Sequence, residues 1–367
     1  MISQRLAVRG TGIAMPGAPV SNADLVRFFE RSASGQLSAF VGSLADELGV
    51  LRRHLCRDLV SNFEVPRAGD TNPELSARAV TAALADAELQ IDDIDVLIGH
   101  TTSPHTLLPP NTSWTADQLG FTGQYMELRQ ACTGFANALT IASAMLQSGA
   151  ADRVCIVGSE TGSVFYDVQE ALRDRSQLVT AAQMGDGAGA VILSRQADAP
   201  TAGSIDHVYF GNLGQHKPTA FSLVTGGSSQ PYVAETPGPR GFYNAYSLAR
   251  DSGLELFQKG FEALASVGLD GATVRRFLPH QANGRMGMVL SPLLGIDESR
   301  FHNHAVKYGN TGSASTWIGL HSVRSEHLLR PGEVLGVLGA EATKFMFGGF
   351  AYFEGQRAPS TSLAMAA

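Results

Sequence analysis

Apolar positions follow two patterns along this chain: short continuous runs, and longer stretches in which they recur three and four residues apart. The continuous runs predict strands at residues 5–14, 94–99, 124–128, 153–158, 184–193, 204–210, 274–279, 333–340 and 350–354. The helical spacing predicts helices at residues 73–87, 112–119, 245–268, 282–294 and 313–329, one that follows Cys132 and ends at Gly149, and an irregular helical stretch at 21–62. Strands and helices alternate, which indicates an α/β protein.

The second half of the chain repeats the plan of the first. DVLIGHTTS matches VRRFLPHQA in position, and VCIVGSE matches VLGVLGAE. Two copies of a βαβαβ-type unit are the natural inference. We expect one half over residues 1–200, a second over residues 201–355, and a disordered tail over 356–367. The connection at 211–244 is long for a compact domain, so we expect it to be functional or mobile.

Composition narrows the class of protein. The chain has 367 residues and a net charge of −7, which argues against nucleic acid as a partner. No apolar run reaches the roughly 18 residues of a membrane helix, and the N-terminus lacks the shape of a signal peptide. Three cysteines without CxxC spacing predict neither a disulfide framework nor a metal site. The default expectation is therefore a cytoplasmic protein with no membrane partner and no metal.

Cys132 lies in a turn of small residues, ACTG, at the start of a predicted buried helix. The positive end of a helix macrodipole stabilises a thiolate over a thiol, so this position suits a nucleophile. The alternative is that Cys132 only packs, as most free cysteines do. The glycine-rich GDGAG at 185–189 lacks the Lys-Ser/Thr ending of a phosphate-binding loop. We interpret its glycines as sites where two backbones approach closely.

Two further polar positions follow predicted strands or turns in an order that lets them meet Cys132. They are His280 in LPHQANGRM and Asn310 in KYGNTGSAS. In a duplicated α/β fold the carboxyl ends of strands and the first turns of helices converge, and ligands bind there. A cysteine beside a histidine supplies a nucleophile and a partner that handles protons or donates hydrogen bonds.

At this point the chain resembles the ketoacyl-ACP synthase III branch of the thiolase superfamily. The similar stretches, in family order, are ACTGFANAL, VGSE, GDGAGAVIL, PHQANGR, YGNTGSAS and FGGFAYF. The resemblance implies a thiolase fold with five layers, α-β-α-β-α, a homodimer, and acyl transfer onto the cysteine without a cofactor. Cys132 would be the acylated nucleophile, and His280 and Asn310 would stabilise an enolate. The N–H groups of Cys132 and Gly349 would form the oxyanion hole.

The resemblance also implies two substrate-binding residues, Arg285 at the pocket mouth and Leu108, which would enter the partner's acyl pocket. Ser43 and Glu47 stand where fatty-acid-initiating members carry a Trp and an Arg that hold coenzyme A. Because Glu47 would repel a phosphate, an acyl group on an acyl carrier protein (ACP), or an unusual donor, is favoured over ordinary acyl-CoA. Gly312, Glu341 and Lys344 are not explained by the resemblance.

Three hypotheses follow. The first is a decarboxylative condensing enzyme in specialised polyketide or modified fatty-acid synthesis, in which an acyl group on Cys132 is attacked by a malonyl-type extender on ACP or CoA. The second is an acyltransferase that passes the Cys132-bound group to an oxygen or nitrogen nucleophile. The third is a non-catalytic partner in a heterodimer, against which the intact Cys132, His280 and Asn310 argue.

Overall fold

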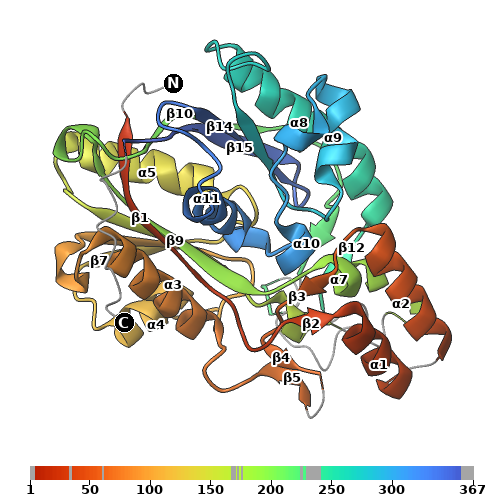
Figure 1. Cartoon of the computed structure of the whole chain (residues 1–367). Coiled ribbons are helices and arrows are strands. Elements are labelled where there is room, and N and C mark those ends of the chain that lie inside the picture. The colour runs from red at the N-terminus through yellow and green to blue at the C-terminus, as the bar shows by residue number, and fades with distance from the viewer. Residues whose placement is uncertain are drawn as a thin grey trace, which may run out of the picture.

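Two central helices separate two sheet halves in the computed structural model of the protein (Figure 1). The structure describes residues 5–32, 35–59, 62–166, 171, 173–174, 177–223, 226–228 and 241–356. The central helices are α5 (Gly134–Ser148) and α11 (Ser315–Ser325). Outer helices cover the far side of each half: α3 (Asn72–Ala87) and α4 (Asn111–Leu119) on one, α8 (Tyr246–Ala265) and α9 (Met286–Leu294) on the other. The layers are therefore α-β-α-β-α, as predicted.

Each sheet half uses the same strand order. The strands of the first half are β1 (Leu6–Ala14), β6 (Val96–His100), β7 (Gln124–Leu128), β8 (Val154–Glu160) and β9 (Gly187–Arg195), in the spatial order β7-β6-β8-β9-β1. Those of the second half are β10 (Ser204–Asn212), β13 (Arg276–Pro279), β14 (Val334–Glu341) and β15 (Met346–Phe353), in the order β13-β14-β15-β10. The counterpart of β7 is reduced to a single bridge between Phe277 and Phe301. The repeated order supports the duplication, while the division after residue 200 stays a prediction.

The two halves are joined at their first strands and through the middle layer. β1 pairs with β10 at only two positions, Leu6 with Ile205 and Ala7 with Ser204. Between the halves, one apolar cluster combines Phe135 of α5, Trp317 of α11 and residues of both sheets. The buried Trp317 Nε1 donates a hydrogen bond to His100 Nε2 (2.9 Å). Burial of this cluster supplies the main force that holds the halves together.

A smaller group of elements lies beside the five layers. The stretch predicted as irregular helix contains two helices and several short strands: β2 (Val20–Ser21), α1 (Asn22–Ser32), α2 (Gly35–Glu47), β3 (Arg52–Arg53), β4 (Arg57–Asp58) and β5 (Asn62–Pro66). Other short elements are α7 (Leu178–Gln183), α10 (Ala305–Tyr308), β11 (Phe221–Ser222) and β12 (Tyr243–Asn244). Helices α1, α2 and α7 share their own apolar core.

The structure confirms most of the predicted elements and corrects their ends. Strand β15 begins at Met346, four residues before the predicted start, so Gly348 and Gly349 lie inside a strand and not in a turn. In the GDGAG stretch, a Cβ on Gly185 would lie 2.0 Å from the Tyr308 carbonyl oxygen, which confirms that this glycine allows a close backbone approach. Residues 229–240 of the predicted long connection and 357–367 of the predicted tail lie outside the described residues. Among the described residues, no helix has the length and apolar character needed to cross a membrane.

Candidate active site

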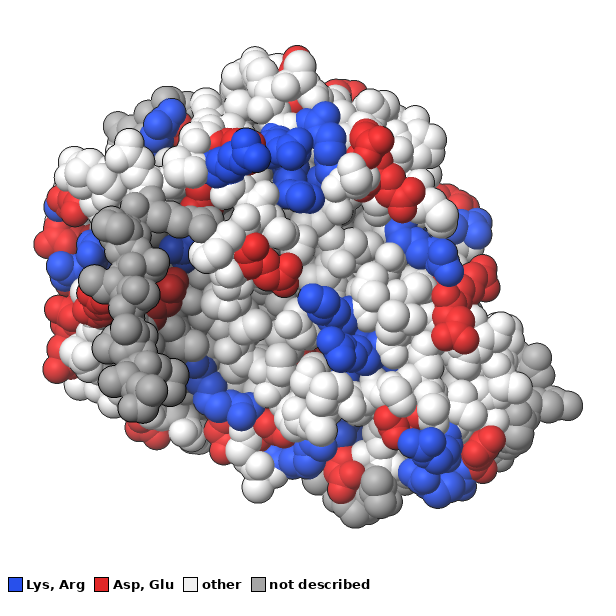
Figure 2. Space-filling model, in the orientation of Figure 1, with Lys and Arg blue, Asp and Glu red and all other residues white. Residues whose placement is uncertain are grey.

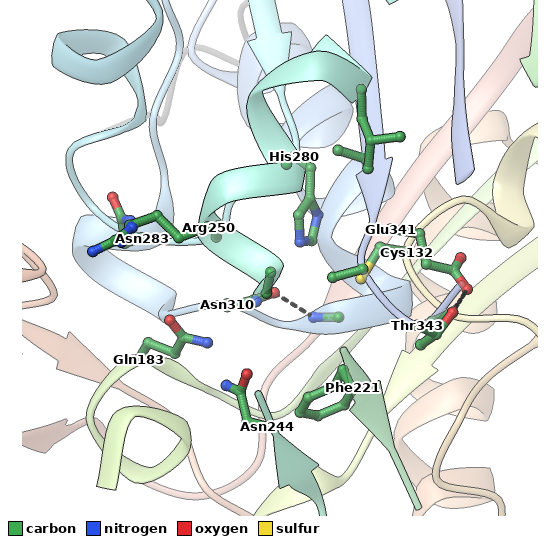
Figure 3. A pocket seen from close by; sticks show the side chains of 18 of the residues that line it. Cys132, Gln183, Phe221, Asn244, Arg250, His280, Asn283, Asn310, Glu341 and Thr343 are labelled. Carbon is green, nitrogen blue, oxygen red and sulfur yellow. Dashed lines mark hydrogen bonds between the residues drawn. The ribbon is translucent and has the colours of Figure 1, made fainter. Parts of the chain in front are cut away.

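Cys132, His280 and Asn310 line one cavity of about 400 Å³ (Figure 3). Cys132 lies in the turn between β7 and α5, His280 follows β13 directly, and Asn310 follows α10. These three positions are separated by up to 178 residues in the chain, and the duplicated fold brings them to one site. The cavity wall is mainly apolar and includes Leu256, Phe257 and Met286.

Cys132 is part-buried and precedes α5 by two residues. Thr133, the residue before α5, binds a carboxylate: Glu341 Oε2 accepts hydrogen bonds from Thr133 N (3.0 Å) and Thr133 Oγ1 (2.7 Å). Burial, followed by the charges of Glu341 and Glu160, raises the pKa of the Cys132 thiol well above its usual value. These effects oppose the one expected from the start of α5, which would favour the thiolate.

His280 presents a neutral imidazole to the cavity. Burial lowers the pKa of His280 to about 4, so the ring carries no charge at neutral pH. Its backbone N–H donates to the Leu338 carbonyl (2.8 Å), which fixes the residue against β14. Its Nδ1 has no hydrogen-bond partner in the described part of the chain. A neutral imidazole carries a proton on one ring nitrogen and can donate one hydrogen bond.

Asn310 is oriented by its own turn. The Gly312 N–H donates to Asn310 Oδ1 (3.0 Å; the dashed line beside Asn310 in Figure 3), so the side-chain amide nitrogen is left to donate elsewhere. Its backbone is also fixed, because Asn310 N donates to Gln183 O (2.7 Å) and Gly185 N donates to Asn310 O (3.0 Å). The site thus offers one N–H donor from His280 and one from Asn310.

Glu160, the last residue of β8, explains Gly312. The Glu160 carboxylate is 1% exposed and accepts from Thr102 Oγ1 (2.8 Å), Ser313 N (3.2 Å) and Ser313 Oγ (3.1 Å), and from the Ser103 hydroxyl. A Cβ on Gly312 would lie 2.5 Å from Glu160 Oε2, and Gly312 has a φ of +49°. Only glycine fits both the backbone and this contact. Burial raises the pKa of the Glu160 carboxyl.

Gly349 does not lie where the resemblance placed it. It is buried in the middle of β15, paired with Leu338 of β14 on one side and with Tyr209 of β10 on the other, and it does not line the cavity. The segment that reaches the cavity is the end of β14 and the turn after it, including Glu341, Ala342 and Thr343. Because β15 begins earlier in the sequence than predicted, the loop that reaches the cavity beside Cys132 is the turn at Ala342, about seven residues before Gly349.

The two predicted substrate-binding residues lie apart from the cavity wall. Arg285 is exposed and donates to the carbonyl groups that end α2, from Nε to Glu47 O (2.6 Å) and from its other guanidinium nitrogen to Asp46 O (3.1 Å). Leu108 is 84% exposed on the loop before α4. The cation that does line the cavity is Arg250 of α8, which the sequence analysis did not single out (Figure 3).

The place of two carboxylates in the site does not follow from the sequence. Glu160 was visible only as part of VGSE, and Glu341 only as an unexplained acid, yet both line the cavity with Cys132. No spacing rule links them to Cys132, because each reaches the site from the end of a different strand. On the face seen in Figure 2, acidic and basic side chains are interspersed.

Comparison with known proteins identifies the family. The sequence pattern of 3-oxoacyl-[acyl-carrier-protein (ACP)] synthase III matches residues 126–212, and that of its C-terminal domain matches residues 264–346. The beta-ketoacyl-[acyl-carrier-protein] synthase III of Rhodobacter capsulatus is 30% identical over 334 residues, which cover 90% of this chain and 94% of the relative. The chain belongs to the beta-ketoacyl-ACP synthase III family. It is therefore an acyl-transferring condensing enzyme that acts on acyl thioesters through an acylated cysteine.

Solved structures of this family and its neighbours share the fold. The tetronic acid condensing enzyme AbyA1 superposes with a TM-score of 0.81 at 25% identity, covering 95% of this chain and 100% of its own. The beta-ketoacyl-ACP synthase III FabH of Pseudomonas aeruginosa gives a TM-score of 0.77 at 24% identity, over 96% of this chain and 99% of its own. Xanthomonas campestris OleA gives 0.78 at 20% identity, over 96% of this chain and 100% of its own.

Proposed function

We propose that the protein condenses a Cys132-bound acyl group with a malonyl-type extender carried by ACP or CoA, with loss of CO2. The observation that carries this proposal is the single cavity lined by Cys132, His280 and Asn310. In the first step the Cys132 sulfur attacks the thioester carbonyl of the donor, and the donor thiol leaves with the proton of the Cys132 thiol. The acyl group is then held as a thioester on the enzyme.

Acylation requires donors for the oxygen that becomes negative. Cys132 N–H is one, as the resemblance implies. The second donor is the backbone N–H of Ala342 and not that of Gly349, because Ala342 lines the cavity and Gly349 does not. Two fixed N–H groups stabilise the developing oxyanion most in a site with little water, and loss of one such donor typically costs about 10² to 10³ in rate.

Condensation requires donors for an enolate. When the extender loses CO2, the electron pair of the broken C–C bond becomes an enolate, and its carbon attacks the acyl carbonyl on Cys132. The C–S bond to Cys132 then breaks, the β-keto thioester leaves on the extender's carrier, and the Cys132 thiolate takes up a proton from solvent. His280 is neutral and Asn310 Oδ1 is already bound, so each offers one N–H to the enolate oxygen without a competing base at that position. Their positions support this assignment.

A second cavity of about 500 Å³ adjoins the first and shares Thr102, Phe221 and Thr343 with it. Its wall includes Leu107, Phe165 and Phe242, and the acyl chain is the apolar part of the substrate that such a wall suits. The wall also includes the loop before α4.

The acyl donor is carried by ACP or CoA. Near the end of α2, the Arg285 guanidinium donates to the Glu47 and Asp46 carbonyls.

The protein is proposed to act as a homodimer. Strand β7 lies at the end of the strand order and pairs only with β6 among the described strands. Near this edge, large apolar side chains are exposed: Leu107 (60%), Leu108 (84%) and Tyr125 (44%). An unpaired edge with exposed apolar side chains is suited to pairing with a second chain. In such a dimer, Leu108 is the residue that we propose enters the partner.

The decisive experiment follows the mass of the intact protein after incubation with acyl-CoAs and acyl-ACPs of different chain length. Wild type should gain the mass of one acyl group, and Cys132→Ala should gain none. Addition of malonyl-ACP or malonyl-CoA should then discharge the adduct with release of CO2. Absence of an adduct with every donor would refute the proposal.

The roles of His280 and Asn310 are separated in the same assay. His280→Ala and Asn310→Ala should still be acylated and should discharge the adduct to a malonyl extender about 10² to 10³ times more slowly, because each loses one enolate donor. Equal loss of acylation and condensation would contradict these roles. Discharge by an alcohol or amine, with none by malonyl thioesters, would replace condensation by simple acyl transfer.

A further inference from the structure

Glu341 connects the turn that carries Cys132 to the turn that follows β14. It is the last residue of β14, and only 2% of it is exposed. One carboxylate oxygen accepts from the N–H and the hydroxyl of Thr133, at 3.0 and 2.7 Å. The other oxygen accepts from the Thr343 hydroxyl, a bond drawn in Figure 3. The two contacts to Thr133 are buried and the one to Thr343 is part-buried, and a charged hydrogen bond is stronger in such surroundings than in water.

The two threonines are placed beside the two N–H groups that the proposed function assigns to the oxyanion hole. Thr133 directly follows Cys132, and Thr343 directly follows Ala342. The Glu341 carboxylate therefore bridges the peptide segments that carry both donors, and the distance between those donors depends on this bridge. This step rests on the proposed function.

We propose that Glu341 is a positioning residue, which ties the Cys132 loop to the Ala342 loop through Thr133 and Thr343 and holds the nucleophile as a thiol until the acyl donor arrives. The first role follows from the hydrogen bonds. The second follows from the position of the negative charge at the start of α5, where it opposes the helix dipole that would otherwise favour a thiolate.

Other ionisable groups also line the cavity with Cys132, so the test must separate their effect on the thiol from that of Glu341. Glu160 lines the cavity from β8, and His280 lines it from β13 as a neutral ring. Neither contacts Thr133 or Thr343 in the described structure, so neither can supply the bridge. Removal of the Glu341 charge alone should therefore change the reactivity of the thiol while Glu160 and His280 remain as they are.

The charge is tested by Glu341→Gln, which has the same shape and can still accept from Thr133. The rate of Cys132 alkylation by iodoacetamide is measured against pH, with Cys132→Ala to subtract the other cysteines. The midpoint should move to lower pH by about one unit or more, as expected when a nearby like charge is removed. The control Glu333→Gln, an acid near the start of β14, should leave the midpoint in place. An unmoved midpoint in Glu341→Gln would overturn the thiol role.

The bridge is tested at Thr343, whose replacement changes no charge. Thr343→Val keeps the shape and loses the hydroxyl, and Thr343→Ser keeps the hydroxyl. Thr343→Val should slow single-turnover acylation about tenfold or more at saturating donor, because misplaced reacting groups cost up to about 10² in rate. Thr343→Ser should recover most of that loss, and the donor concentration at half-maximal rate should change little.

Equal acylation rates in Thr343→Val, Thr343→Ser and wild type would overturn the bridge. Failure of the proposed function gives a different result, because wild type itself would then form no acyl adduct. The alkylation measurement needs no acyl donor, so the thiol role is tested in either case. Circular dichroism of each variant shows whether it is folded. If a variant is unfolded, Glu341→Asp is used in its place, because it shortens the bridge and keeps the charge. In Glu341→Asp the acylation rate should fall while the midpoint of alkylation against pH stays the same.

Discussion

At the residue scale, the site is determined by contacts between side chains that the sequence does not pair. Gly312 is the sharpest case, because its backbone conformation and the Glu160 carboxylate both exclude a side chain. Glu160 in turn binds Ser313, which follows Gly312, and Asn310 binds the Gly312 N–H. Gly312 therefore allows Asn310 and the buried Glu160 carboxylate to hold their positions next to each other.

Gly312→Ala should lower the free energy of unfolding by more than the roughly 1–2 kcal/mol that a left-handed backbone costs a non-glycine residue. The added Cβ would also meet Glu160 Oε2 at 2.5 Å. Urea denaturation measures the change. The matched control is Gly268→Ala, since Gly268 has a φ of +81° but no atom within 4 Å of the added Cβ. Glu160→Asp, which withdraws the carboxylate, should restore part of the loss in the double variant. Equal losses in the two glycine variants would contradict the contact.

At the element scale, strand β7 and the loop before α4 form the part of the molecule that lacks a partner strand and exposes apolar side chains. β7 is covered by α4 but has one unpaired edge among the described strands, and Leu107, Leu108 and Tyr125 are exposed there. By contrast, the corresponding strand in the second half is absent except for one bridge at Phe301. The two halves therefore differ at the edge where a second copy could pair.

Tyr125→Asp and Leu108→Asp should each convert a dimer into a monomer, because a buried unpaired charge is costly at an interface. Light scattering after size-exclusion chromatography measures the mass. Phe40→Asp is the control, since Phe40 is also 41% exposed but lies on α2, which Figure 1 places on the opposite side of the molecule from β7. A monomeric wild type, or dimers that survive both changes, would contradict the proposal.

Most elements could be predicted from the sequence, because their apolar patterns are strong and local. The continuous run at 153–158 and the helical spacing after Cys132 both gave elements of the right type. The ends were less predictable. FMFGGF contains two glycines that suggest a turn, but pairing with β10 and β14 extends β15 back to Met346. Gly349 therefore lies inside a strand, and the turn that contains Ala342 lines the cavity.

The site was predictable only as far as its motifs reach. Cys132, His280 and Asn310 stand in distinctive local sequences, and the structure brings them to one cavity. The reactivity of Cys132 was not predictable, because it depends on Glu341, which is 209 residues away in the chain. Long-range contacts of this kind leave no periodic signal in a single sequence.

At the scale of the whole molecule, buried neutral histidines link stability to pH. Burial lowers the pKa of His100 to about 3 and those of His280 and His302 to about 4, and it lowers the pKa of His304 well below its usual value. In the unfolded chain these groups titrate at about 6.5. Below that pH the unfolded chain binds protons that the folded protein excludes, so stability falls as pH falls toward 4.

The free energy of unfolding should therefore decrease between pH 7 and pH 5, by about 1.4 kcal/mol per pH unit for each such histidine once its unfolded form is protonated. The buried carboxyls of Glu160 and Asp186 act in the opposite direction, because their pKa values are raised, while His321 adds a fifth histidine whose pKa is lowered. Urea titrations at several pH values measure the slope. His302→Gln, which can still bind Ser322, should make the slope shallower. A stability independent of pH over this range would refute the argument.

The hydrogen bond between Trp317 and His100 has a consequence for how the protein can be observed. The chain contains two tryptophans: Trp317 is fully buried between the halves, and Trp114 is 37% exposed near the β7 edge. Their fluorescence should report different events, with Trp114 sensitive to association at that edge and Trp317 sensitive to separation of the halves. Replacement of either one by Phe leaves a single optical reporter, so assembly and unfolding can be followed separately without an added label.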